Sequence, residues 1–122
     1  MSKSTFLGNK QLDAEFNSVA FSVTGDPLIS LHTGDPGTTG ANEVAGGSYA
    51  RQATVFGAAA AKSVTNTSAA VFSGMPAAVV THVGAWSAAG DFLRGGELNE
   101  SITVFLSGVI TLGIGEITAT EA

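Results

Sequence analysis

The sequence predicts a mainly β fold, a single antiparallel β-sandwich or jelly-roll-like domain that carries one N-terminal helix. Helical periodicity is confined to the start of the chain, and short apolar segments then recur about every ten residues between turn residues. Many short strands at such spacing are typical of a sandwich or a small barrel. The 122 residues suit one domain, 1–122, whose core needs no metal or disulfide.

The only helix is expected at residues 4–21. Leu12, Phe16 and Val19 recur at helical spacing, and polar residues occupy the other faces. The sequence Gly25-Asp26-Pro27 is expected to end the preceding segment just before the first strand. Two residues are suitable N-caps of this helix, Ser4 and Asn9.

Seven strands are expected after the helix, each bounded by Gly, Asn, Ser or Pro. The segment 57–62 follows a strand and is too short for a helix, so it is expected to be a turn or an extended link. Residues 87–90 suit a four-residue hairpin loop. The expected strands are 28–33, 49–56, 68–73, 77–86, 91–98, 102–106 and 109–118.

A long glycine-rich loop is expected at 34–48. It contains five glycines and one proline and has no apolar period. Loops of this length in compact domains are usually functional or form interfaces. Glu43 and Arg51 are two of the few charged residues, and we expect them to pair across the loop or at its base.

Charge is scarce in this chain. Only 12% of the residues are Asp, Glu, Lys or Arg, whereas an average soluble domain has about 25%. A surface with so few charges is expected to be covered by copies of the same chain or by other partners. The alternative is a soluble monomer with a face rich in Ser and Thr.

The distribution of charge and apolar residues excludes several partners. The net charge is −5 and the five basic residues are scattered, whereas nucleic-acid binding needs clustered cations. Apolar runs are too short to span a bilayer. Asp13 and Glu15 lie where a signal peptide would have its apolar segment, so secretion by that route is not expected.

The sequence offers little for catalysis. His32 and His82 both lie on expected strands, and a Ser-His-Asp triad would need Asp35 or Asp91 as its third member. No GxSxG nucleophile elbow is present. A histidine among small and apolar strand residues more often has a structural role. We therefore expect no enzymatic activity.

No metal or cofactor is expected either. The chain has no cysteine, two histidines cannot complete a zinc site, and no phosphate-binding glycine motif occurs. Asp35 and Glu43 are carboxylates beside loop carbonyls that suit calcium, but the spacing of a calcium loop is missing. The favoured interpretation is a plain turn in which Asp35 accepts hydrogen bonds from nearby amides.

Two aromatic residues are candidates for stacking on a sugar. Trp86 is the only tryptophan and lies at a strand end, and Tyr49 is the only tyrosine. The favoured alternative for Trp86 is packing in the core or at a subunit interface, where a single large aromatic is a natural anchor.

Three segments carry a resemblance to a known group. They are LHTGDPG at 31–37, GANEV at 40–44 and GGSYARQ at 46–52, followed by VTHVGAW at 80–86. Over about residues 28–98 the chain resembles small virion proteins of tailed phages that are described as tail-fibre-like or minor structural proteins. The resemblance implies a non-enzymatic, multimeric virion component with a β-sandwich body.

Two positions on the particle follow from this resemblance. The first is an oligomeric capsid decoration or cement-type protein, bound as a homo-oligomer such as a trimer to the major capsid protein. The alternative is a tail-fibre or tail-tip protein that contacts other tail proteins and recognises a host surface glycan. In both, the protein is assembled into the virion in the host cytoplasm. Candidate interface or binding residues are Asp35, Glu43, Tyr49, Arg51, His82 and Trp86.

Overall fold

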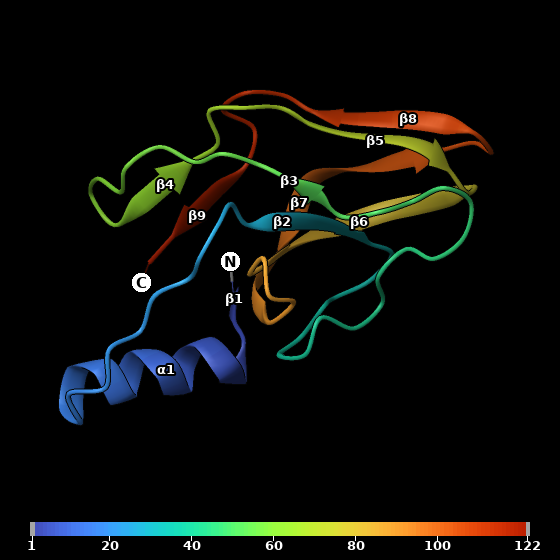
Figure 1. Ribbon diagram of the computed structural model, residues 1–122. Helices are drawn as coiled ribbons and strands as arrows, with labels where there is room; N and C mark the ends of the chain where they lie inside the picture. The colour runs from blue at the N-terminus through green and yellow to red at the C-terminus, as the bar shows by residue number, and fades with distance from the viewer. Residues whose placement is uncertain (1, 122) are drawn as a thin grey trace.

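The computed structural model describes residues 2–121 and is mainly β, with one helix near the N-terminus (Figure 1). Every pair of neighbouring strands is antiparallel. The predicted fold class is thus confirmed. The elements are β1 (Ser2–Lys3), α1 (Thr5–Phe16), β2 (Leu28–His32), β3 (Gln52–Ala53), β4 (Ser63–Thr65), β5 (Ala70–Met75), β6 (Ala78–Trp86), β7 (Phe92–Val104), β8 (Gly108–Leu112) and β9 (Thr118–Thr120).

Two layers of strands enclose the core. One layer is a five-stranded sheet in the order β1-β7-β6-β2-β3, and the β5–β8 pair lies across it (Figure 1). A second pair, β4–β9, extends the body toward α1. The apolar side chains between the layers are buried, and each removes apolar surface from water as the chain folds. They include Ile29, Leu31, Phe72, Met75, Val80, Val83, Ile110 and Leu112.

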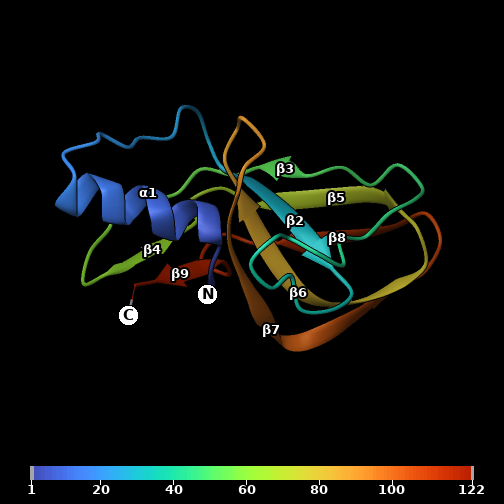
Figure 2. The same ribbon diagram turned by 90° about the horizontal axis from the view of Figure 1, so that it is seen from below.

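The opposite face of the large sheet is covered by the loop 34–48. Alternation along β2 directs Ile29 and Leu31 into the core and therefore places Ser30 and His32 on the other face. Figure 2, seen from below, shows the loop lying across this face of β2 and β6. Both faces of β2 are consequently buried, including the polar side formed by Ser30 and His32.

Four of the predicted strands have different bounds in the structure. The predicted strand 49–56 is reduced to β3 and an isolated bridge between Phe56 and Asn66, and Tyr49 and Arg51 turn their side chains to Glu43. The segments 91–98 and 102–106 form one strand, β7, whose register against β6 shifts at a bulge opposite Thr81. The predicted strand 109–118 is divided at Gly113–Gly115 into β8 and β9.

The remaining strand predictions are largely confirmed. β2, β5 and β6 lie within two residues of the predicted 28–33, 68–73 and 77–86. The hairpin loop 87–90 is closed by a hydrogen bond of 2.8 Å from the Ser87 amide to the Asp91 carbonyl. The short strands β1 and β4 escaped prediction because two or three residues carry no periodicity.

The helix begins as predicted and ends early. Ser4 is the N-cap, and its hydroxyl accepts a hydrogen bond of 3.0 Å from the Leu7 amide. The helix ends at Phe16, and Ser18 has a positive φ of 57°. The prediction of a helix to residue 21 was therefore wrong, since periodicity continued past a backbone reversal. No helix among the described residues is long and apolar enough to cross a membrane.

The apolar stripe of the helix does not face the body. Leu7 is its only buried residue, whereas Leu12 and Phe16 are exposed. Val19, which lies beyond the helix end, is exposed as well. The stripe that the sequence shows is therefore not used for packing within the chain.

Asn66 joins the β4–β9 region to the β8–β9 turn. Its side-chain amide donates to the carbonyls of Ser68 (2.8 Å) and Gly113 (2.9 Å). Its side-chain oxygen accepts from the amides of Gly115 (3.1 Å) and Ile117 (2.9 Å). Asn66 is 1% exposed, so one buried side chain bonds to four backbone groups, two of which, the Ser68 carbonyl and the Ile117 amide, depend on it alone.

We predict that Asn66→Ala lowers the free energy of unfolding by about 3 kcal/mol, because it removes four hydrogen bonds and leaves the Ser68 carbonyl and the Ile117 amide without partners. Urea denaturation checks this value. Asn99→Ala is the matched control, since Asn99 is exposed and its loss should cost less than about 0.5 kcal/mol. Equal effects of the two substitutions would contradict the role assigned to Asn66.

Candidate functional site

The candidate site is the region where the loop 34–48 and the following residues meet β2 and β6. The loop continues the edge of the sheet beyond β3. The Val44 amide donates to the Leu31 carbonyl and the Thr33 amide donates to the Asn42 carbonyl, both at 2.9 Å. The loop is thus held by the same kind of backbone pairing that joins strands.

Glu43 is the centre of a charged cluster. Its Oε2 accepts hydrogen bonds from the Tyr49 hydroxyl (2.8 Å) and from Arg51 Nε (2.9 Å). Its Oε1 accepts from Arg51 Nη2 at 2.9 Å, so the guanidinium binds the carboxylate through two parallel bonds. The predicted pairing of Glu43 with Arg51 is therefore confirmed. The Tyr49 hydroxyl oxygen also accepts a hydrogen bond of 3.0 Å from the Leu31 amide.

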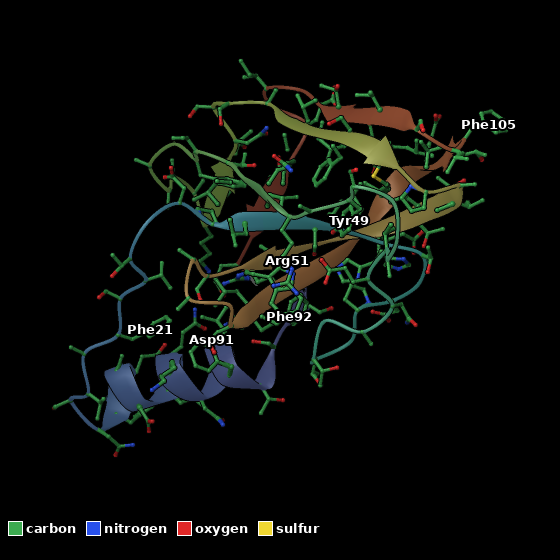
Figure 3. All side chains as sticks on the ribbon, turned by 45° about the vertical axis from the view of Figure 1, so that its right-hand side comes forward. Phe21, Tyr49, Arg51, Asp91, Phe92 and Phe105 are labelled. Carbon is green, nitrogen blue, oxygen red and sulfur yellow. The ribbon has the colours of Figure 1, made fainter. Side chains whose placement is uncertain are left out.

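Arg51 also contacts Trp86. Its guanidinium carbon lies 3.4 Å from the centroid of the indole ring, a distance at which the cation is attracted to the face of the ring. Phe92 packs against the same indole, with ring centroids 5.0 Å apart. Figure 3 shows Arg51 beside Phe92, with Tyr49 on the adjoining segment. Trp86 is 9% exposed.

A chain of hydrogen bonds runs from Trp86 to the loop. The indole N–H donates to Ser30 Oγ at 2.8 Å, and Ser30 Oγ lies 2.6 Å from His32 Nε2. His32 Nδ1 lies 2.7 Å from the carbonyl oxygen of Ala41. Since that carbonyl can only accept, Nδ1 carries the proton and Nε2 accepts from Ser30. The indole N–H, the Ser30 hydroxyl and both ring nitrogens of His32 therefore all have hydrogen-bond partners.

The environment keeps these groups in defined protonation states. Burial lowers the pKa of His32, which agrees with a neutral ring that donates to Ala41. Burial raises the pKa of Glu43, but hydrogen bonds from Arg51 and Tyr49 outweigh it and the net shift is downward. Burial also raises the pKa of Tyr49, so its hydroxyl stays protonated and donates.

Two glycines leave room for this arrangement. A Cβ on Gly40 would lie 2.6 Å from the Trp86 ring, and Gly40 has a φ of +81°, which favours glycine. A Cβ on Gly84 would lie 2.6 Å from Ser30 Oγ and 2.8 Å from His32 Nε2. The glycines of the loop and of β6 therefore permit close contact between backbone and side chains.

Two of the sequence-predicted residues lie outside the cluster. Asp35 is exposed, and its Oδ1 accepts the Gly37 amide at 2.8 Å, which confirms the plain turn. His82 is hydrogen-bonded to the Thr81 hydroxyl at 2.8 Å and lies 4.0 Å from Glu97. The cluster thus unites Glu43, Tyr49, Arg51 and Trp86 and leaves Asp35 and His82 apart.

Trp86 is not placed to stack on a sugar, because its ring is covered by Arg51, Phe92 and the loop. Tyr49 is partly buried, and its ring stacks on Phe72 with centroids 6.1 Å apart. The favoured interpretation of Trp86 as a packing residue is confirmed within the chain.

Ser30 Oγ and His32 Nε2 are as close as a nucleophile and its general base, but no substrate can reach them. Both residues have 0% exposure, and His32 Nδ1 binds a carbonyl instead of a carboxylate. His32 is a candidate from the sequence, whereas Ser30 was missed, because its only signal is its place two residues earlier on the same face of the strand. Within residues 2–121, no three His, Asp or Glu side chains are grouped to hold a metal ion.

A groove lies elsewhere, along β7 and the β8–β9 turn. Its volume is about 650 Å³. Apolar residues such as Leu98 and Ile117 line it together with three glutamates, and none of the six candidate residues does. The glutamates are Glu97, Glu100 and Glu116.

A comparison with protein-family models finds a family that matches nearly the whole chain. Residues 2–120 match the family described as "Podophage GP4 fiber I protein gp80". The chain belongs to this family. It is therefore a phage structural protein, and the match to the podophage fibre family extends beyond residues 28–98, on which the resemblance rested. A search of curated proteins found no significant match.

We predict that Arg51→Lys destabilises this fibre-family protein by about 1–2 kcal/mol, because lysine can neither form the two parallel bonds to Glu43 nor stack on Trp86 in the same way. Urea denaturation measures the change. Lys62→Arg, an exchange at an exposed turn residue, is the control and should stay within about 0.5 kcal/mol. A neutral Arg51→Lys would show that the cluster does not stabilise the loop.

Acid should destabilise the protein in two stages. Below pH about 6.5 the histidine protonates in the unfolded chain but stays neutral at His32 in the folded protein, so stability falls as pH decreases. Glu43, whose folded pKa is lowered, adds a further loss below pH about 4.3. Denaturant midpoints measured across this range check the sign. A flat profile between pH about 7.5 and 5 would contradict the first stage.

Proposed function

We propose that this protein is a non-enzymatic structural subunit of a fibre on a tailed-phage particle, present in several copies that contact one another and neighbouring virion proteins. The match of residues 2–120 to a family described as a podophage fibre protein carries the proposal. The family description favours the tail-fibre alternative over the capsid decoration that was expected from the sequence.

The interior of the site supports a structural role. The polar groups that suit chemistry, Ser30 and His32, are buried and bonded to one another and to the loop. Glu43, Tyr49 and Arg51 likewise satisfy one another. Side chains arranged this way hold a long loop in one conformation, which suits a subunit with fixed contact surfaces.

The surface supports contact with other subunits. Within residues 2–121 eleven large apolar residues are exposed, and only 12% of the chain is charged. Monomeric proteins rarely expose extended apolar surface unless it binds something. The proposal does not include sugar stacking on Trp86, because that ring is covered.

Copy number and position on the particle test the proposed function. Purified virions would be analysed by quantitative mass spectrometry against the major capsid protein, and gold-labelled antibody would locate the chain. A fibre subunit is expected in roughly 3 to 18 copies at the tail or its attachment site, following the symmetry of such organelles. Hundreds of copies spread over the head would instead indicate a capsid decoration, and absence from particles would contradict both.

A further inference from the structure

One end of the sandwich has no charged side chain. It is formed by the segments 44–50, 72–81 and 102–110, none of which contains Asp, Glu, Lys, Arg or His. Hydrogen bonds join these segments, since the Ser48 amide donates to the Gly74 carbonyl and the Ser107 amide to the Met75 carbonyl, both at 2.8 Å. Free surfaces of soluble domains usually carry interspersed charges, so this end has the composition of a covered surface.

Large apolar side chains project from this end. Phe105 and Leu106 occupy the turn between β7 and β8 and are 78% and 76% exposed. Val109 follows on β8 and is also exposed. We call these three residues the tip patch. A turn of this kind ordinarily carries Gly, Asn, Asp or Ser, and nothing within the chain packs on Phe105 or Leu106 sufficiently to bury them.

A second unpartnered apolar surface lies at the other end of the molecule. Leu12 and Phe16 lie one turn apart on α1, and Val19 follows the end of the helix; we call these three exposed residues the helix patch. Phe16 is 76% exposed. Figure 1 shows α1 and the β7–β8 turn at opposite ends, and Figure 3 shows Phe105 far from Phe21, which follows the helix. A subunit therefore cannot cover its own helix patch with its own tip patch.

We propose that the tip patch of one copy binds the helix patch of the next copy, in a head-to-tail contact between identical subunits. A contact of tip with tip, or of helix with helix, would leave the other patch of every copy uncovered. The head-to-tail contact covers both patches on every copy when it closes into a ring or continues along a filament. This inference rests on the proposed function, in which it supplies the contact between copies.

The sizes of the two patches match each other. From their exposed fractions, the three side chains of each patch present roughly 300–400 Å², about half of the roughly 800 Å² that one partner contributes to a standard interface. Their chemistry matches as well, because the tip patch brings no charge that the apolar helix face would leave unpaired.

Cross-linking tests the contact directly, because the natural chain has no cysteine. Phe105→Cys and Phe16→Cys variants of the full chain would be purified separately, mixed and treated with a short bis-maleimide linker. We expect a covalent dimer that contains one copy of each variant and little product from either variant alone. Ile114→Cys, at an exposed apolar residue of another turn, replaces Phe105→Cys in the control mixture and should give no such dimer.

The mass of the unmodified chain and of two further variants completes the test. Light scattering after gel filtration should show several copies for the natural chain and for Ile114→Ser, and a single copy for Phe105→Ser combined with Leu106→Ser. Because both replaced residues are exposed, the double variant should keep the thermal unfolding midpoint of the natural chain. A monomeric natural chain, or efficient cross-linking of either cysteine variant with itself, would overturn the head-to-tail contact.

The two proposals fail separately. If virions contain a few tail-located copies and the mixed variants do not cross-link, the head-to-tail contact is wrong and the fibre function stands. If the cross-link forms between purified chains that are absent from virions, the contact stands and the fibre function is wrong.

Discussion

The bonding of the Glu43 carboxylate determines the course of the loop and thereby one whole face of the sheet. It draws Tyr49 and Arg51 toward β2, so the segment after the loop satisfies the Leu31 amide through a side chain instead of a strand. Arg51 then lies on Trp86, which in turn binds Ser30. A buried carboxylate without these donors would be costly. The loop, the tryptophan and the buried histidine are therefore parts of one arrangement.

This dependence explains which predictions from the sequence were correct. Strands with strong alternation or dense apolar character, such as β2 and β6, appear where the pattern places them. The pairing of Glu43 with Arg51 was predictable because charge is so scarce that the two have few other partners. The bond of Ser30 to His32 could be inferred only in part, since strand alternation puts them on one face but does not show what covers that face.

Other features lay beyond local pattern. The early end of the helix depends on Ser18 in a left-handed conformation, and the apolar period simply runs through it. The division of 109–118 depends on Asn66, which is more than forty residues away in the chain and binds the turn through both ends of its amide. Sequence spacing reports neither, because each arises from contacts between distant segments.

The cluster around Arg51 also bears on how the particle would survive digestive enzymes. A trypsin-type protease needs a lysine or arginine on a segment that can enter its cleft in extended form, and such segments are usually mobile loops. This chain offers only five such residues. Arg51, next to the longest loop, is bonded to Glu43 and stacked on Trp86. Arg94 lies within β7, and its side chain is bonded to Glu121. The side chains that hold the loop in place therefore also keep the peptide bond after Arg51 from entering the cleft of a protease.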